Sequence, residues 1–92
     1  MSVSLEFPLP GALLTAADGR LGPAGLTITV RGQGPRQTPV FVNDEVVETG
    51  ADGRFACEVT LLAGEGWLVA GLLLGCAKVT ARVPVKVELP AS

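Results

Sequence analysis

Apolar and polar residues alternate along much of the chain with the period of two that a half-buried β-strand shows. The clearest run covers residues 77–89, where every second side chain is Ala, Val or Leu. Pro84 falls among the outward positions of this run and has no N–H group to donate. We therefore expect the strand to lie at a sheet edge or to bulge at Pro84.

Shorter alternating or β-branched runs predict further strands over residues 3–7, 26–30, 39–42, 45–48, 55–61 and 67–73. Turn residues separate them, including Asn43-Asp44 and Asp52-Gly53. Many short strands with frequent glycine and proline between them are typical of a sandwich. The pattern predicts one domain over residues 1–92, an all-β, antiparallel β-sandwich of about seven strands.

The composition removes several classes of function. No run approaches the roughly 18 apolar residues of a membrane-spanning helix, so no membrane span is expected. The basic residues are scattered in a chain of net charge −2, so nucleic-acid binding is not expected either. The chain has no His and no Tyr, which leaves little for acid–base chemistry. We expect no enzyme activity, no cofactor and no metal site.

Acidic residues gather near the expected hairpin, namely Asp44, Glu45, Glu48 and Asp52. Two of these carboxylates could meet, as in a glycosidase or a calcium site. Solvated turn residues are the alternative that we favour, because calcium loops concentrate more oxygen ligands at alternating positions.

Both ends of the sequence fit a fragment of a longer chain. The first residues lack the charged and apolar regions of a secretory signal, and Pro90-Ala91-Ser92 is similar to the start of a linker. We therefore expect a domain excised from a longer protein.

The middle of the chain resembles bacterial immunoglobulin-like (Ig-like) domains, including the domain-B type found beside glucodextranase-like enzymes. The resemblance rests on the runs at residues 40–47, 51–55, 59–62 and 64–66. Asp44 stands where the family has a hairpin glycine, and Gly66 where asparagine is common. The resemblance implies an Ig-like sandwich in a secreted or cell-surface protein, which serves as a spacer, an adhesive module or an accessory to a carbohydrate-active enzyme.

The two cysteines leave two interpretations open. Cys57 faces inward by the alternation, and Cys76 lies in the loop before the last strand, at the same end of an Ig-like sandwich. A disulfide between them would close a loop of about 19 residues and contribute on the order of 3 kcal/mol. Two independent reduced thiols, with Cys57 as a small core residue, are the alternative.

The direction of the side chains suggests an interaction surface. If Leu68, Ala70 and Leu72 point into the core, an outward set remains in two neighbouring strands, namely Phe41, Trp67, Val69 and Leu73. A slip of one residue would instead make Trp67 part of the core. An exposed apolar patch of this kind marks an interface with a neighbouring domain or a second copy. The alternative is a carbohydrate-binding accessory domain in which a polysaccharide stacks on Trp67.

Overall fold

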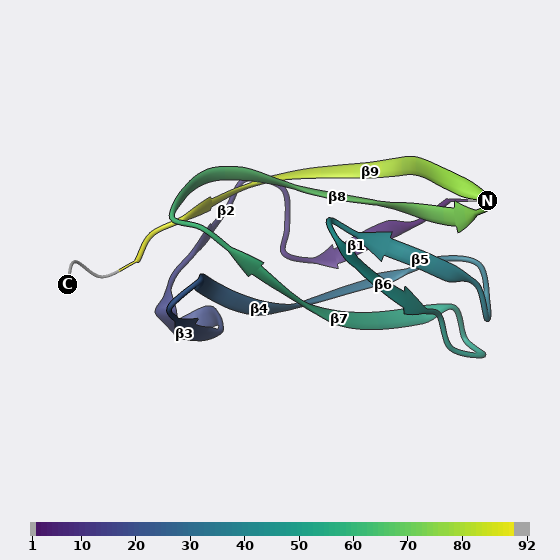
Figure 1. Ribbon diagram of the computed structural model, residues 1–92, viewed down its shortest axis with the longest axis horizontal. Helices are drawn as coiled ribbons and strands as arrows, with labels where there is room; N and C mark the ends of the chain where they lie inside the picture. Colours follow the sequence, from purple (N-terminus) through teal and green to yellow (C-terminus); the bar gives the residue numbers. More distant parts are fainter. Residues whose placement is uncertain (1, 90–92) are drawn as a thin grey trace.

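The alternating segments form strands in the computed structural model, which describes residues 2–89 (Figure 1). Within these residues there are nine strands and one 3-10 turn, η1 (Ala16–Asp18). The strands are β1 (Ser4–Phe7), β2 (Ala12–Leu14), β3 (Arg20–Gly22), β4 (Gly25–Gln33), β5 (Pro39–Val42), β6 (Glu45–Glu48), β7 (Arg54–Leu61), β8 (Gly64–Leu74) and β9 (Cys76–Val87). The sequence pattern did not predict β2 and β3, because three residues are too few to show alternation.

The strands form two sheets. In the four-stranded sheet, β4 pairs along its length with β7, and its other edge pairs with β1 and β3. The five-stranded sheet has the order β2-β9-β8-β5-β6, in which β2 runs parallel to β9 and the other pairs are antiparallel. The all-β class and the two-sheet sandwich arrangement are therefore confirmed.

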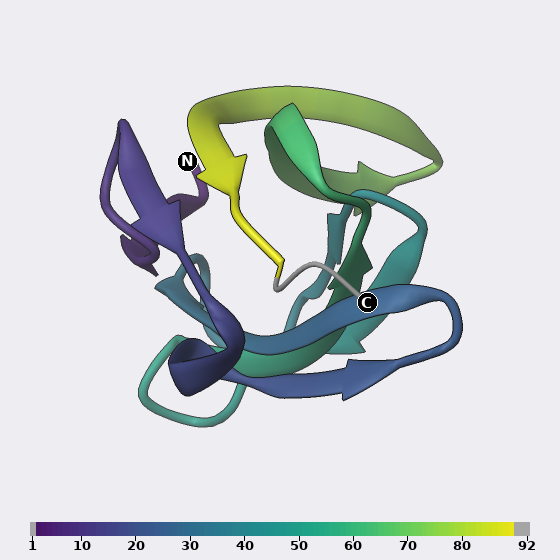
Figure 2. The same ribbon diagram turned by 90° about the vertical axis from the view of Figure 1, so that its left-hand side faces the viewer.

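The core lies between the two sheets. Figure 2 shows β8 and β9 (green to yellow) on one side of it and β4 (blue) on the other. Inward positions of both sheets supply the buried side chains, among them Leu26, Ile28 and Val30 of β4, Val40 and Val42 of β5, Leu68, Ala70 and Leu72 of β8, and Val83, Val85 and Val87 of β9. The alternation predicted this division into inward and outward sets.

The position of Pro84 differs from the expectation. Strand β9 lies between β8 and β2 here, and Pro84 pairs in regular register with Trp67 of β8. The Pro84 carbonyl accepts a hydrogen bond of 2.7 Å from the Gly11 N–H. Since the nitrogen and oxygen of a strand residue point to the same side, the Pro84 nitrogen also faces away from β8, and no bond of the β8–β9 ladder is lost.

A β-bulge does occur in this ladder, but at Thr80. Ala70 pairs with Ala81, while the next residue of β8, Gly71, pairs with Val79, so Thr80 is the extra residue. The Thr80 hydroxyl accepts a hydrogen bond of 2.9 Å from the Val3 N–H and donates one of 3.0 Å to the Val3 carbonyl. The bulge thereby ties β9 to the segment just before β1.

Candidate interaction face

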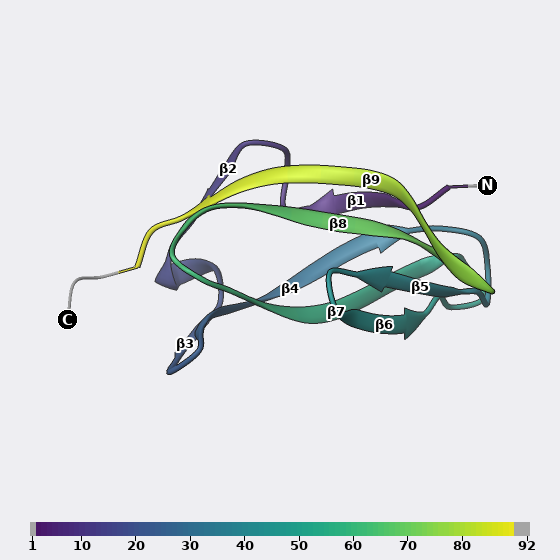
Figure 3. The same cartoon turned by 45° about the horizontal axis from the view of Figure 1, so that its top comes forward.

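The outer surface of the five-stranded sheet carries a set of apolar side chains that we call the apolar face. Its strands succeed one another in Figure 3 as β9, β8, β5 and β6. The register assigns the members by alternation from the buried positions. In these four strands they are Phe41 of β5, Val46 of β6, Trp67, Val69 and Leu73 of β8, and Val79 of β9.

One row of this face crosses four strands. Val46 pairs with Phe41, Phe41 pairs with Gly71, and Gly71 pairs with Val79. Val46 is 59% exposed and Val79 is 43% exposed. The sequence pattern placed Val79 on the inner side of its strand, and that expectation was wrong, because the extra residue Thr80 reverses the direction of the side chains before it.

Trp67 lies on the same face and is 59% exposed, so it points away from the core as the alternation predicts. Strand β5 ends at Val42, which pairs with Ala70, so Trp67 lies beyond the end of β5. Two shallow hollows of about 540 and 400 Å³ adjoin the indole, and Gly66 lines both of them. The ring is thus accessible from the sheet surface and from the side.

Phe41 corrects the expected patch. Its position is on the outer side of the sheet, and it is not a member of the core cluster, yet only 8% of it is exposed. Its neighbour on β8, Gly71, has no side chain, which leaves room for the ring beside its cross-strand partner Val46. The expected exposure of Phe41 was therefore wrong, while Val69 and Leu73 are partly exposed.

Charged residues flank the apolar face with opposite signs on its two sides. Arg82 and Lys86 alternate with the buried valines of β9 and are exposed. Asp44 and Glu48 belong to the β5–β6 hairpin at the opposite edge and are also exposed. The face is therefore basic along β9 and acidic along β6, and the middle is apolar except for the exposed Glu65 of β8, which pairs with Lys86.

The hairpin itself is fixed to β8 at its turn. Asn43 adopts a positive φ of 52°, which this residue type tolerates. Its side-chain oxygen accepts a hydrogen bond of 2.9 Å from the Val69 N–H, and its own N–H donates one of 2.8 Å to the Val69 carbonyl. Asp44 is thereby held at the level of Val69 along the sheet.

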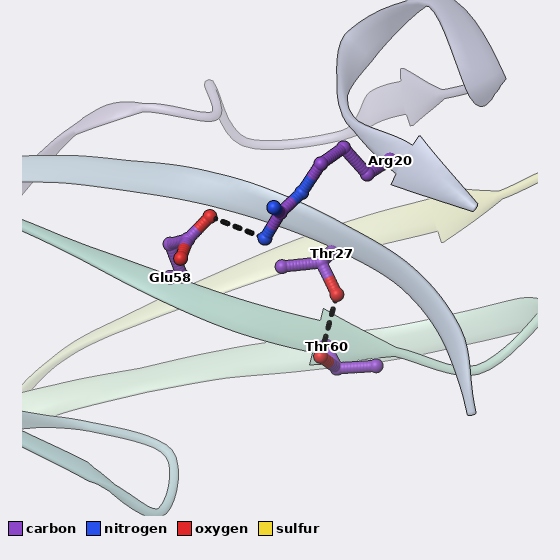
Figure 4. A network of polar contacts seen from close by, with 4 residues as sticks. All are labelled: Arg20, Thr27, Glu58 and Thr60. Carbon is purple, nitrogen blue, oxygen red and sulfur yellow. Dashed lines mark hydrogen bonds and ion pairs between the residues drawn. The ribbon is translucent and has the colours of Figure 1, made fainter. Parts of the chain in front are cut away.

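The outer surface of the four-stranded sheet is polar by contrast. Figure 4 shows Arg20 donating a hydrogen bond of 2.8 Å to Glu58 in an exposed ion pair, beside the hydroxyls of Thr27 and Thr60, which lie 2.8 Å apart. Exposed ion pairs and hydroxyl pairs of this kind contribute little to stability. The sandwich thus has one polar outer surface, on the four-stranded sheet, and one largely apolar outer surface, on the five-stranded sheet.

Both cysteines are free thiols. Cys57 belongs to β7 of the four-stranded sheet and packs against the core, whereas Cys76 is exposed at the start of β9 in the other sheet. The structure therefore has the two independent thiols and not the Cys57–Cys76 bridge. Burial, together with the nearby carboxylate of Glu45, raises the pKa of the Cys57 thiol, so it stays protonated at neutral pH.

The acidic residues of the hairpin region do not form a ligand cluster. The Asp52 side chain accepts a hydrogen bond of 3.0 Å from the Arg54 N–H, as a turn aspartate does. Among residues 2–89, no group of three His, Cys, Asp or Glu side chains could hold a metal ion. No helix in the same range is long and apolar enough to cross a membrane.

Comparisons with protein-family models, with curated proteins and with solved structures give no match.

Proposed function

We propose that this chain is a non-catalytic Ig-like module that associates with another protein surface through the apolar face. The observation that carries the proposal is the difference between the two outer surfaces. Strands β4 and β7 alternate buried apolar residues with Thr, Arg and Glu outside. Strand β8 instead carries Trp67, Val69 and Leu73 outside. Exposed apolar patches on soluble domains are typical of interfaces.

The order of the strands supports the Ig-like part of the proposal. In Ig domains the second strand lies between the first and the fifth, and the third, sixth and seventh main strands form the other sheet. Here β4 lies between β1 and β7, and β9-β8-β5 form the centre of the other sheet. Strand β6 extends that sheet beyond β5, as the additional strand of variable-type domains does.

The arrangement of polar groups supports a binding role without catalysis. All Asp and Glu residues in the described part of the chain are exposed, and no buried side-chain nitrogen or oxygen there lacks a hydrogen-bond partner. An unsatisfied buried polar group is a common mark of a reacting or ligand-binding site. The proposal also places the domain in a larger protein outside the cytoplasm. Only the family resemblance supports this location.

A carbohydrate-binding accessory domain is the second candidate. Trp67 favours it, because an exposed indole beside a hollow offers a surface on which a sugar ring can stack. The burial of Phe41 counts against it, since a chain without Tyr is then left with one exposed aromatic ring on this face.

Static light scattering tests the leading candidate through the osmotic second virial coefficient, which measures net attraction between molecules. We expect attraction in the wild type, and Val46→Lys should turn it into repulsion by placing a charge on the apolar face. Thr29→Lys on the polar surface changes the net charge equally and should leave the attraction in place. Equal effects of the two substitutions would refute the role of this face, and a saturable change of Trp67 fluorescence with a polysaccharide would favour the second candidate.

A further inference from the structure

We infer that the apolar face binds a second copy of this chain, across a two-fold axis that lies in the interface and runs parallel to the strands. The inference rests on the proposed function and names its partner. Rotation about such an axis keeps each residue at its level along the strands and exchanges the two sides of the sheet. Strand β9 of one copy therefore lies over the β6 side of the other, and β8 lies over β5.

The apolar row that crosses the sheet is complementary to itself under this rotation. An axis between β5 and β8 places Val46 of one copy over Val79 of the other, since these residues end the row. The same rotation places Phe41 over Gly71. Phe41 is only 8% exposed and already lies beside Gly71 of its own copy, so the outer positions, which bring two exposed valines together, make the main contact of the row.

One pair of opposite charges, Arg82 and Asp44, is complementary under the same rotation. Arg82 pairs with Val69, and Asn43 is hydrogen-bonded to Val69 from the other side, so Arg82 and the Asn43-Asp44 turn share one level. They lie three strands apart, about 14 Å at a spacing of about 4.8 Å. The rotation brings Arg82 of each copy over Asp44 of the other, which forms two equivalent ion pairs at the rim.

The other in-plane two-fold axis, perpendicular to the strands, lacks this complementarity. It places β9 over β9 and the hairpin over the hairpin. The basic side chains of Arg82 and Lys86 would then face their own copies, and the acidic side chains of Asp44 and Glu48 would do the same. Like charges brought together in this way oppose association.

The size of the face predicts a weak dimer. The four strands that overlap are about 19 Å wide together, and β5 and β6 are four residues long, about 13 Å, which gives about 250 Å² for each copy. Trp67 of the two copies would approach each other near the axis and add to this contact. The total stays below the roughly 1,000 Å² of a stable specific interface, so a transient dimer is expected.

Sedimentation velocity over a concentration series tests the dimer with charge-reversal variants. Arg82→Glu and Asp44→Lys should each weaken dimerisation about tenfold, because each turns both ion pairs into repulsions. An equimolar mixture of the two variants should regain wild-type affinity. In that heterodimer the two substituted positions pair with each other, carboxylate against ammonium, and the unchanged Arg82 of one copy pairs with the unchanged Asp44 of the other. Arg31→Glu, on the polar surface, carries the same change of charge and should leave the affinity unchanged.

The outcomes separate this inference from the proposed function. If Arg82→Glu behaves as Arg31→Glu does, or if the mixture fails to regain affinity, the two-fold arrangement is wrong. If the wild type stays monomeric while light scattering still shows attraction that Val46→Lys removes, the two-fold dimer is excluded and the association role of the face remains. If sedimentation shows no dimer and light scattering shows no attraction, both the two-fold dimer and the association role of the apolar face are wrong.

Discussion

Replacing the hydroxyl of Thr49 by a methyl group should destabilise the fold measurably. Thr49 is 2% exposed and follows β6, and its hydroxyl holds the connection between β4 and β5. The hydroxyl donates to the Pro35 carbonyl and accepts a hydrogen bond of 2.8 Å from the Thr38 N–H. Thr49→Val keeps the shape and the β-branch but leaves both backbone groups without this partner.

The magnitude follows from the cost of unpaired buried polar groups. Each such group costs about 1–3 kcal/mol, and partial access of water to this part-buried region reduces the sum, so we expect a loss of about 2 kcal/mol. A chain of this length has a total stability of about 5–14 kcal/mol. The melting temperature should therefore fall by about 8–16 °C.

Urea unfolding followed by far-UV circular dichroism measures this loss. Trp67 is a poor reporter of unfolding, because it is already largely exposed in the fold. Thr60→Val is the matched control, since its hydroxyl lies 2.8 Å from that of Thr27 on the outer surface, where water replaces it. Thr60→Val should lower the free energy of unfolding by less than about 0.5 kcal/mol. Equal losses for Thr49→Val and Thr60→Val would refute the reasoning.

Two further predictions concern a thiol and a glycine. Iodoacetamide should modify Cys76 well before Cys57, whose raised pKa and burial protect it, and Glu45→Gln should shift the pH profile of Cys57 alkylation to lower pH. Folding raises the pKa of the Cys57 thiol. The stabilisation that this thiol contributes is therefore present below its pKa in the unfolded chain and is lost as the pH rises through its pKa in the folded protein. Gly71→Ala should lower the free energy of unfolding by about 2–3 kcal/mol, because a Cβ atom there would clash with the Lys78 carbonyl oxygen. A Cβ atom at Gly66 would meet nothing within 4 Å, so Gly66→Ala should leave the free energy of unfolding in urea close to the wild-type value. Equal alkylation rates of the two cysteines, or equal stability of the two alanine variants, would contradict these predictions.

The sequence predicted the direction of the side chains wherever the ladder is regular. The buried set Leu68, Ala70 and Leu72 fixes Trp67 on the outside, because adjacent strand residues point to opposite faces. Alternation fails at Thr80, where one extra residue turns Val79 outward. Gly71 is the one residue in the sequence that could have indicated this bulge, since a glycine inside a strand often marks a bulge or a close backbone contact.

The burial of Phe41 could not be predicted in the same way. Alternation gives the face on which a side chain lies but not how far its neighbours cover it. The cover depends on which residues stand opposite on β6 and β8, and here these are Val46 and Gly71. Pairing between strands that are distant in sequence is a property of the assembled sheet, so it is absent from the pattern of any single strand.

The edges of the sheets give a further reason to place association on the face. An unpaired strand edge can bind another chain through its backbone, but the five-stranded sheet ends in β2, of three residues, and β6, of four. Glu45 and Glu48 add charges to β6, which lies beside β7 and so covers the edge of the other sheet as well. Short and charged edges oppose extension of the sheet. The apolar face, with Trp67 and the row from Val46 to Val79, is then the part of the described surface where burial against a partner yields the most free energy.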